Sequence, residues 1–245
     1  GKPRFWVKHG RSVTRGEGLT QAHVAKIVNA DHVRVVRVPE VYLIFSRGTW
    51  AYIVMELAGG MTFAKRKLDK GNYGEDNMKA IKMPVDTSPG YIGGGRIGHD
   101  FFVECLSKLE YHTVGDLEEH INRVLILAET KSSVNFQSEI TDGLVLCPSD
   151  LDDTNIMVDN TGTIWAIDFG RTCFLPSSFM DYSSRSSSKP FGQRMAGLVD
   201  YPKSDNYPAM ETAAGQLVLH NNSFAKSPLS ILFRYAALVT NCIGT

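Results

Sequence analysis

The chain of 245 residues lacks an excess of either charge, because 26 basic side chains balance 26 acidic ones. A dedicated binder of nucleic acid or of an anionic membrane carries a basic excess, so the balance argues against both partners. Long apolar runs are also missing. None approaches the length of about 20 residues that crosses a bilayer, and the first residues have no signal-peptide core. These absences predict a cytoplasmic globular protein.

Paired metal ligands and hydrolase motifs are absent as well. The four cysteines are scattered and form no C-x-x-C pair: Cys105, Cys147, Cys173 and Cys242. This spacing predicts reduced, mostly buried thiols in place of a zinc site or a disulfide framework. The seven histidines show no H-x-x-x-H spacing, and no G-x-S-x-G elbow supports a serine hydrolase. Apolar residues make up 43% of the chain, which is ample for a buried core.

Local patterns predict strands around one helix in the first sixty residues. Apolar and β-branched runs favour strands at 4–8, 33–38, 41–45 and 51–55, and a helical stripe covers 17–28. The third and fourth strands are separated by a short segment that contains Gly48, which is typical of a hairpin. The pair Gly59 and Gly60 then interrupts the pattern, and we expect a lobe boundary there.

Helical signals dominate between residues 60 and 130. The clearest helix is 116–130, where Leu117, Ile121, Val124 and Leu125 share one face. Further along, the patterns predict strands, a turn, a surface loop and two closing helices. The strands are 144–147, 155–158 and 163–167, the hairpin turn is 159–162, the loop is 177–206, and the helices are 208–220 and 227–242.

The chemistry concentrates between residues 147 and 170. Asp150 and Asn155 form the D-x-x-x-x-N of a kinase catalytic loop, and Asp168 opens a D-F-G tripeptide across the predicted hairpin. Since a hairpin returns its second strand beside its first, Asn155 and Asp168 can converge on one Mg²⁺ ion. Asp150 then lies where it can accept the proton of an attacking hydroxyl. A single turn aspartate is usually a capping group, but the joint spacing is far more specific.

Several motifs resemble the aminoglycoside phosphotransferase and choline kinase-like family. The family's H-G-D-L-x-x-x-N corresponds to 148–155, and its I-D-F-G is intact at 167–170. Its V-x-K-x-G with a first-helix glutamate is similar to 7–10 followed by Glu17. The segments 89–95 and 99–102 resemble fungal members of the family.

The resemblance implies an α+β, two-lobed protein-kinase-like fold and ATP-dependent transfer of the γ-phosphate to a hydroxyl of a small molecule. The N-lobe would be 1–57 and the C-lobe 58–245. The implied roles are Asp150 as base, Asn155 and Asp168 as Mg²⁺ ligands, Lys8 at the α/β-phosphates, Glu17 orienting Lys8, and Glu56 and Leu57 beside the adenine.

Two departures from the family pattern keep an alternative open. Pro148 replaces the histidine that braces the catalytic loop, and the family's first two strands have no counterpart before Lys8. We therefore also consider a catalytically impaired, pseudokinase-like module that binds a nucleotide or a partner without turnover. Five retained polar residues favour catalysis, whereas the missing strands favour the impaired module.

Two smaller patterns also have alternatives. Asp152 and Asp153 suit a cationic acceptor, or they are solvated loop residues. The segment 93–98 matches the G-x-G-x-x-G of dinucleotide folds, but two prolines and a polar run precede it where a buried strand is required. We expect a loop near the active cleft instead.

The neutral net charge hides a marked asymmetry along the chain. Residues 1–40 hold eight basic and three acidic side chains, whereas residues 141–168 hold six aspartates and no Lys or Arg. A basic segment opposite an acidic one suits a polyphosphate with its magnesium ion between them.

Overall fold

The computed structural model describes residues 5–30, 36–66, 82–83, 87–198, 201 and 203–221. The predicted helix 227–242 lies outside these residues. In chain order the elements are β1 (Phe5–Gly10), α1 (Arg15–Val28), β2 (Val36–Arg37), β3 (Val41–Arg47), β4 (Trp50–Glu56), β5 (Met61–Thr62), α2 (Phe63–Arg66), β6 (Lys82–Met83), β7 (Arg96–Gly98), η1 (Val103–Cys105), β8 (Leu106–Glu110), α3 (Val114–Leu127), η2 (Gln137–Glu139), β9 (Leu144–Pro148), β10 (Ile156–Val158), β11 (Ile164–Ala166), β12 (Thr172–Leu175), α4 (Ser177–Ser186), α5 (Pro190–Leu198) and α6 (Tyr207–Leu219).

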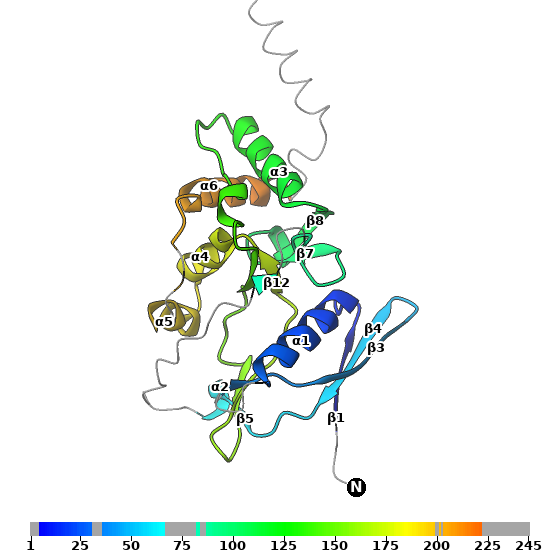
Figure 1. Ribbon diagram of the computed structural model, residues 1–245. Coiled ribbons are helices and arrows are strands. Elements are labelled where there is room, and N and C mark those ends of the chain that lie inside the picture. The colour runs from blue at the N-terminus through cyan, green and yellow to red at the C-terminus, as the bar shows by residue number, and fades with distance from the viewer. Residues whose placement is uncertain are drawn as a thin grey trace, which may run out of the picture.

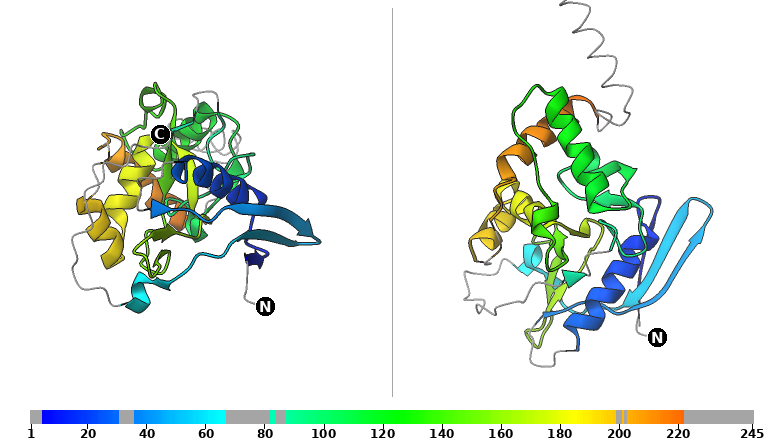
Figure 2. Two further views of the ribbon diagram at one scale, coloured as in Figure 1. Left: turned by 60° about the horizontal axis from the view of Figure 1, so that its bottom comes forward. Right: turned by 45° about the horizontal axis from the view of Figure 1, so that its top comes forward.

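The first sheet has the strand order β1-β4-β3, with antiparallel pairing throughout. The predicted hairpin is confirmed as β3 and β4, and Gly48 takes the left-handed conformation, at φ +60°, that its turn requires. The predicted helix is confirmed as α1. Figures 1 and 2 show α1 lying between this sheet and the rest of the chain, and it contacts both β3 and β12.

Local sequence explains where α1 begins and how closely it packs. The Thr14 hydroxyl accepts a hydrogen bond from the Glu17 amide at 3.0 Å, which caps the first turn. Gly18 faces the sheet, where an added Cβ would lie 2.8 Å from the Ile44 side chain and 3.2 Å from that of Ile53. A larger residue would force the Ile44 side chain to shift, so glycine favours this close approach of the helix to the strands.

A second sheet has the order β2-β11-β10-β5. Its centre is the β10–β11 hairpin, which confirms the predicted turn at 159–162. The Asp159 carboxylate accepts hydrogen bonds from the Thr161 and Thr163 amides and from the Trp165 indole, so the turn is held by its own side chains. Strand β2 pairs with β11 in parallel, so the sheet combines strands from both predicted lobes.

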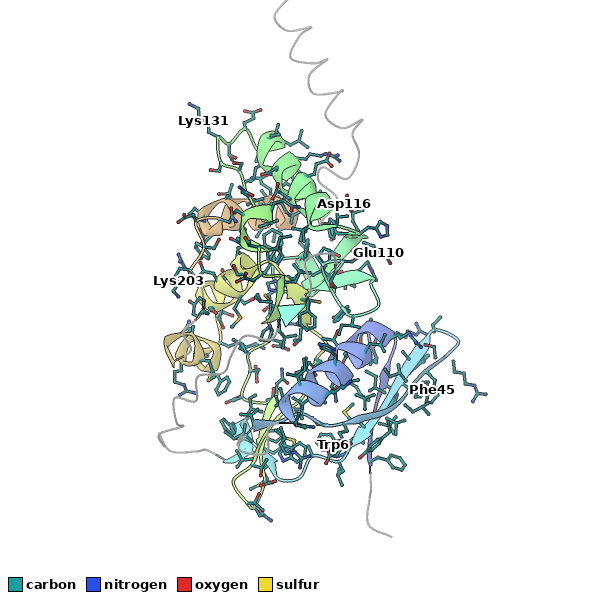
Figure 3. All side chains as sticks on the ribbon, viewed as in Figure 1. Trp6, Phe45, Glu110, Asp116, Lys131 and Lys203 are labelled. Carbon is teal, nitrogen blue, oxygen red and sulfur yellow. The ribbon has the colours of Figure 1, made fainter. Side chains whose placement is uncertain are left out.

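The largest hydrophobic core lies in the second half of the chain. The predicted helix around 116–130 is confirmed as α3, which begins at a capping box formed by Thr113 and Asp116. Its predicted apolar face, including Leu117 and Ile121, is fully buried. This core packs α3 against α6, which confirms the other predicted helix at 208–220. In Figure 3, Trp6 and Phe45 mark one end of the molecule, and Asp116 and Lys131 mark the opposite end.

Two sequence predictions are wrong. The region 60–130 was expected to be helical, but it contains the antiparallel pair β7 and β8. A serine-rich composition predicted a surface loop at 177–206, yet this segment holds α4 and α5. The small serines fit against neighbouring elements, and the fully buried Asp181 accepts a hydrogen bond from Arg185 one turn later at 2.8 Å. Burial therefore overrides the weak helix propensity of serine.

The glycine-rich segment is not a dinucleotide fingerprint. Gly93, Gly94 and Gly95 all have positive φ, between +83° and +102°, and the strand β7 follows them. A dinucleotide fingerprint must open a helix at this point.

Within the described ranges, no helix combines the length and the apolar character needed to span a membrane.

Candidate active site

Three charged residues from distant parts of the chain meet beside α1. The Lys8 ammonium lies 2.5 Å from a Glu17 carboxylate oxygen and 2.7 Å from Asp168 Oδ1. Lys8 comes from β1, Glu17 from the first turn of α1, and Asp168 follows β11. Glu17 is only 2% exposed, whereas the side chains of Lys8 and Asp168 are 31% and 44% exposed. We call these three residues the ion-pair group.

Burial and ion pairing shift the pKa values of all three residues. Burial raises the pKa of the Glu17 carboxyl, and the Lys8 charge only partly opposes it. Burial alone would lower the pKa of Lys8, but Glu17 and Asp168 outweigh this effect, so the pKa is raised. Burial likewise acts to raise the pKa of Asp168, but Lys8 outweighs it and lowers the pKa overall. Lys8 therefore stays protonated and Asp168 stays ionised at neutral pH.

The turn after β11 aims Asp168 at Lys8. Asp168 takes the left-handed conformation, with φ +64°, and its Oδ1 accepts a hydrogen bond from the Gly170 amide at 3.1 Å. Aspartate tolerates this conformation because its short side chain can bond to the nearby backbone. Within the part of the chain that the structure describes, Asp168 Oδ2 makes no hydrogen bond, so it stays open to a ligand.

Asn155 precedes β10 and lies at the same open end of the β10–β11 hairpin as Asp168. Its carbonyl accepts a hydrogen bond from the Ile167 amide at 2.9 Å, which brings it beside the residue that precedes Asp168. The Asn155 side-chain NH₂ donates to the Asp150 carbonyl at 3.0 Å, and no described residue donates a hydrogen bond to its amide oxygen. No group of three or more His, Cys, Asp or Glu side chains fit to hold a metal occurs among the described residues.

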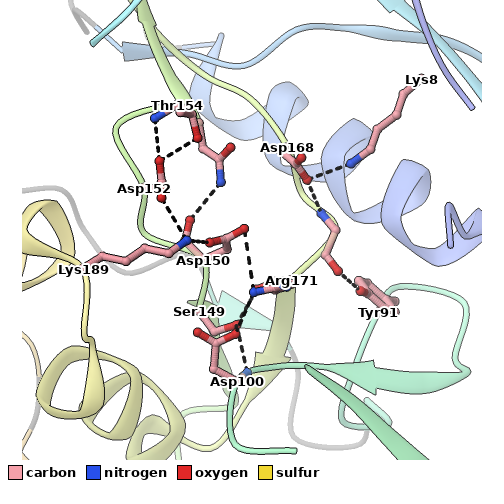
Figure 4. Close-up of polar contacts among 12 residues, drawn as sticks. Lys8, Tyr91, Asp100, Ser149, Asp150, Asp152, Thr154, Asp168, Arg171 and Lys189 are labelled. Carbon is pink, nitrogen blue, oxygen red and sulfur yellow. Dashed lines mark hydrogen bonds and ion pairs between the residues drawn. The ribbon is translucent and has the colours of Figure 1, made fainter. Parts of the chain in front are cut away.

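The Asp150 carboxylate is paired with cations (Figure 4). Oδ1 accepts a short hydrogen bond from the Lys189 ammonium, and Oδ2 lies 3.9 Å from the Arg171 guanidinium. Lys189 also lies 2.9 Å from Asp152, whose carboxylate is held by the Thr154 hydroxyl and amide. Burial would lower the pKa of Lys189, but the two aspartates raise it overall. Asp153 lies beside this cluster, and its carbonyl accepts a hydrogen bond from Ala64.

A second polar network braces the loop before Asp150. Ser149 is buried and follows Pro148, the last residue of β9. Its amide donates a hydrogen bond to the Arg171 carbonyl at 2.9 Å. Its hydroxyl lies 3.3 Å from Asp100, which also accepts a hydrogen bond from Arg171 at 3.3 Å. The loop is therefore held without a histidine at position 148.

His99 does not take part in this network. It is fully buried, its Nδ1 accepts from the Phe101 amide at 3.0 Å, and its Nε2 lies 2.9 Å from the Ser183 hydroxyl. Burial lowers the pKa of His99 to about 3, so it is a neutral core residue.

Glu56 and Leu57 lie at and just after the end of β4, and both are half-buried. The Glu56 amide donates to the Glu40 carbonyl at 2.8 Å, and its carboxylate accepts from the Glu40 amide at 3.3 Å. The Glu56 side chain is therefore engaged by backbone.

Sequence reasoning missed two residues that pair with Asp150, namely Arg171 and Lys189. It also missed Tyr91, which bonds to Gly170, and Asp100, which bonds to Ser149 and Arg171. Arg171 directly follows the D-F-G tripeptide, and this adjacency was an available signal. Lys189 had no such signal, because it lies in the segment that was predicted to be a surface loop.

Comparisons with known proteins give likenesses to solved structures only, and one of these is described here. No protein-family model matches the chain, and no curated protein matches it. The chain is similar to the crystal structure of a thermostable mutant of aminoglycoside phosphotransferase APH(4)-Ia, a ternary complex with AMP-PNP and hygromycin B. The sequence identity is 18% and the TM-score is 0.39, over 99% of this chain and 88% of that chain.

Proposed function

We propose that this protein is an ATP-dependent phosphotransferase that moves the γ-phosphate to a hydroxyl of a small molecule. The observation that carries the proposal is the ion-pair group, in which β1, α1 and the D-F-G turn each contribute one charge. Burying the Glu17 carboxylate beside Lys8 costs desolvation free energy. A function that requires the lysine ammonium at this position would account for that cost. Such a lysine suits the phosphates of a nucleotide.

Asp168 and Asn155 fit a magnesium ion. Asp168 offers a carboxylate oxygen and Asn155 an amide oxygen that no described residue occupies, and hard oxygen ligands of this kind are what Mg²⁺ prefers. The ion usually keeps several waters and binds through one or two protein ligands, so a cluster of three carboxylates is not required. The bound ion would supply neutralisation of phosphate charge.

Asp150 is proposed as the residue that orients and deprotonates the acceptor hydroxyl. Ser149, Arg171 and Asp100 hold its loop, and placement of this kind supplies much of the catalysis when the transition state is loose. Lys8 would contact the α/β-phosphates while Glu17 fixes its direction. The backbone around Glu56 and Leu57 would border the adenine.

The wider assignments follow from this site. We propose a two-lobed, protein-kinase-like arrangement with lobes at 1–57 and 58–245, and a cytoplasmic location, where ATP and free thiols are both maintained. Cys105, Cys147 and Cys173 are all free. Asp152, which holds a lysine ammonium in this structure, supports a cationic acceptor.

Two measurements test the proposal. Wild-type protein is titrated with ATP in the presence and absence of Mg²⁺, and ATP consumption is then followed over a panel of small alcohols, amines and sugars. We expect Mg²⁺-dependent binding, and consumption with at least one acceptor. Failure to bind Mg-ATP would contradict the proposal and favour the alternative, a catalytically impaired module that binds a partner.

The matched variants are Asp168→Asn and Asp205→Asn. Asp205 lies in an exposed turn before α6 and has no assigned role. Asp168→Asn should lose Mg²⁺-dependent binding, because the substitution removes the charge that faces Lys8 and the proposed ion. Asp205→Asn should behave like the wild type.

A further inference from the structure

The segment around Tyr91 joins α1, which carries Glu17, to β12, which follows the D-F-G turn. On one side, the Ile92 amide donates to the Thr20 hydroxyl in α1 at 3.0 Å. On the other side, Gly90 exchanges two backbone hydrogen bonds with Phe174 in β12, at 2.9 and 2.8 Å. Strand β12 begins only two residues after the D-F-G turn. The segment therefore links α1 to the chain that follows Asp168.

Tyr91 itself contacts both parts of the ion-pair group's scaffold. Its hydroxyl donates a short hydrogen bond to the Gly170 carbonyl, and the Gly170 amide donates in turn to Asp168 Oδ1 (Figure 4). The other side of the tyrosine lies against Gly16, where an added Cβ would stand 2.6 Å from the Tyr91 Cβ. Gly16 directly precedes Glu17 in the first turn of α1.

A third glycine completes the surroundings of the ring. A Cβ on Gly98 would lie 2.0 Å from the Tyr91 hydroxyl oxygen and 2.9 Å from the Gly170 carbonyl oxygen. Tyr91 is only 5% exposed, so the hydroxyl cannot exchange its protein partner for bulk water. Gly16 and Gly98 thus leave room for one side chain, and that side chain reaches the D-F-G turn.

We infer that Tyr91 is a positioning residue for the ion-pair group. It sets the separation between the first turn of α1 and the D-F-G turn, and through them it keeps Glu17 and Asp168 within reach of the same Lys8 ammonium. The inference rests on the proposed function only in what the group binds. Its geometric part concerns the unliganded protein and can be tested without nucleotide.

The test compares Tyr91→Phe with Tyr111→Phe in the full chain. Tyr111 is 4% exposed, and its hydroxyl lies 2.7 Å from Nδ1 of His120, which belongs to α3. Each variant deletes one buried hydroxyl and adds no atom, so both should fold with similar small losses of Tm. A purely structural role predicts the same behaviour for the two variants.

The first readout is hydrogen exchange without nucleotide. Tyr91→Phe should speed exchange about 3- to 10-fold in peptides that cover 14–18 and 166–172, as expected for loss of one buried hydrogen bond. Tyr111→Phe should leave both segments at the wild-type rate. Unchanged exchange in Tyr91→Phe, or equal acceleration in the two variants, would overturn the inference.

The second readout is nucleotide affinity. The KM for Mg-ATP should rise about 3- to 10-fold in Tyr91→Phe and the KM for the acceptor should rise less, because the lost bond acts on Asp168 through Gly170 and reaches Asp150 only through Arg171. Equal rises in both KM values would overturn the inference. If wild-type protein fails to bind Mg-ATP, the proposed function fails, and the exchange experiment alone decides the role of Tyr91.

Discussion

Replacing Glu17 with glutamine separates what the ion-pair group does for stability from what it does for activity. The folded protein holds the pKa of Glu17 above the ordinary value of 4.5, chiefly because the carboxylate is buried. A raised pKa means that the protonated side chain stabilises the fold. This contribution is fully present below about pH 4.5 and is lost as the pH rises through the raised pKa. At pH 7 the wild type therefore carries the cost of a buried charge.

Glutamine avoids this cost because it resembles the protonated acid. Lys8 loses one partner but keeps Asp168 at 2.7 Å, and its ammonium is partly exposed to water. Removing one partner of a buried ion pair usually destabilises a protein, but Lys8 keeps Asp168, so we expect Glu17→Gln to gain at most about 2 kcal/mol of unfolding free energy at pH 7. The gain should shrink as the pH falls toward 4.5, where the wild-type carboxyl takes up a proton.

Activity should change in the opposite direction. A hydrogen bond to a charged group contributes about 1.5–3 kcal/mol, so loss of the 2.5 Å contact should lower kcat/KM for Mg-ATP by about 10- to 150-fold. Urea denaturation between pH 4.5 and 8 and steady-state kinetics measure the two effects.

The control is Glu119→Gln, which removes an exposed ion pair with Arg123 on α3 and should change stability by less than about 0.5 kcal/mol at every pH. The reasoning fails if Glu17→Gln is destabilised by more than about 2 kcal/mol at pH 7 and the loss persists at pH 4.5.

Asp150→Asn should keep the fold but lower kcat about 10²- to 10⁴-fold in single-turnover assays, and normal turnover would remove this residue as the base. Gly215→Ala should raise the unfolding free energy by about 1 kcal/mol in urea titration, because this glycine lies inside α6 with no atom within 4 Å of an added Cβ. Gly16→Ala should lower it by about 1–3 kcal/mol, because the new methyl group meets the Tyr91 Cβ at 2.6 Å; a gain would show that α1 shifts freely.

Sequence reasoning succeeded where the determining interactions are local. The β10–β11 turn is held by Asp159 and residues two to six positions away, so its composition alone predicts it. Helix α3 is similarly specified by its capping box and one apolar face. The order of Asp150, Asn155 and Asp168 around this hairpin follows from the same short-range pattern.

The failures have a tertiary cause. Helix α4 buries an aspartate and several serines, and this depends on contacts with β9 and with Ser204 that no local pattern contains. Lys189 follows α4, so its contact with Asp150 was hidden by the same error. Tyr91 could not be found either, because its role depends on Gly16 and Gly170, which are distant in sequence.

The mixed sheet determines how the chain would behave if it were cut. Strand β2 belongs to the first 57 residues but pairs with β11, and Trp6 packs on the cluster that contains Met157 and Trp165. A break at Gly59 would leave Lys8 and Glu17 in one fragment and Asp168 in the other. Neither fragment could assemble the ion-pair group alone, and reassociation along β2 and β11 would restore it. If the proposed nucleotide binding holds, its recovery in co-expressed halves would report that the two fragments recognise each other.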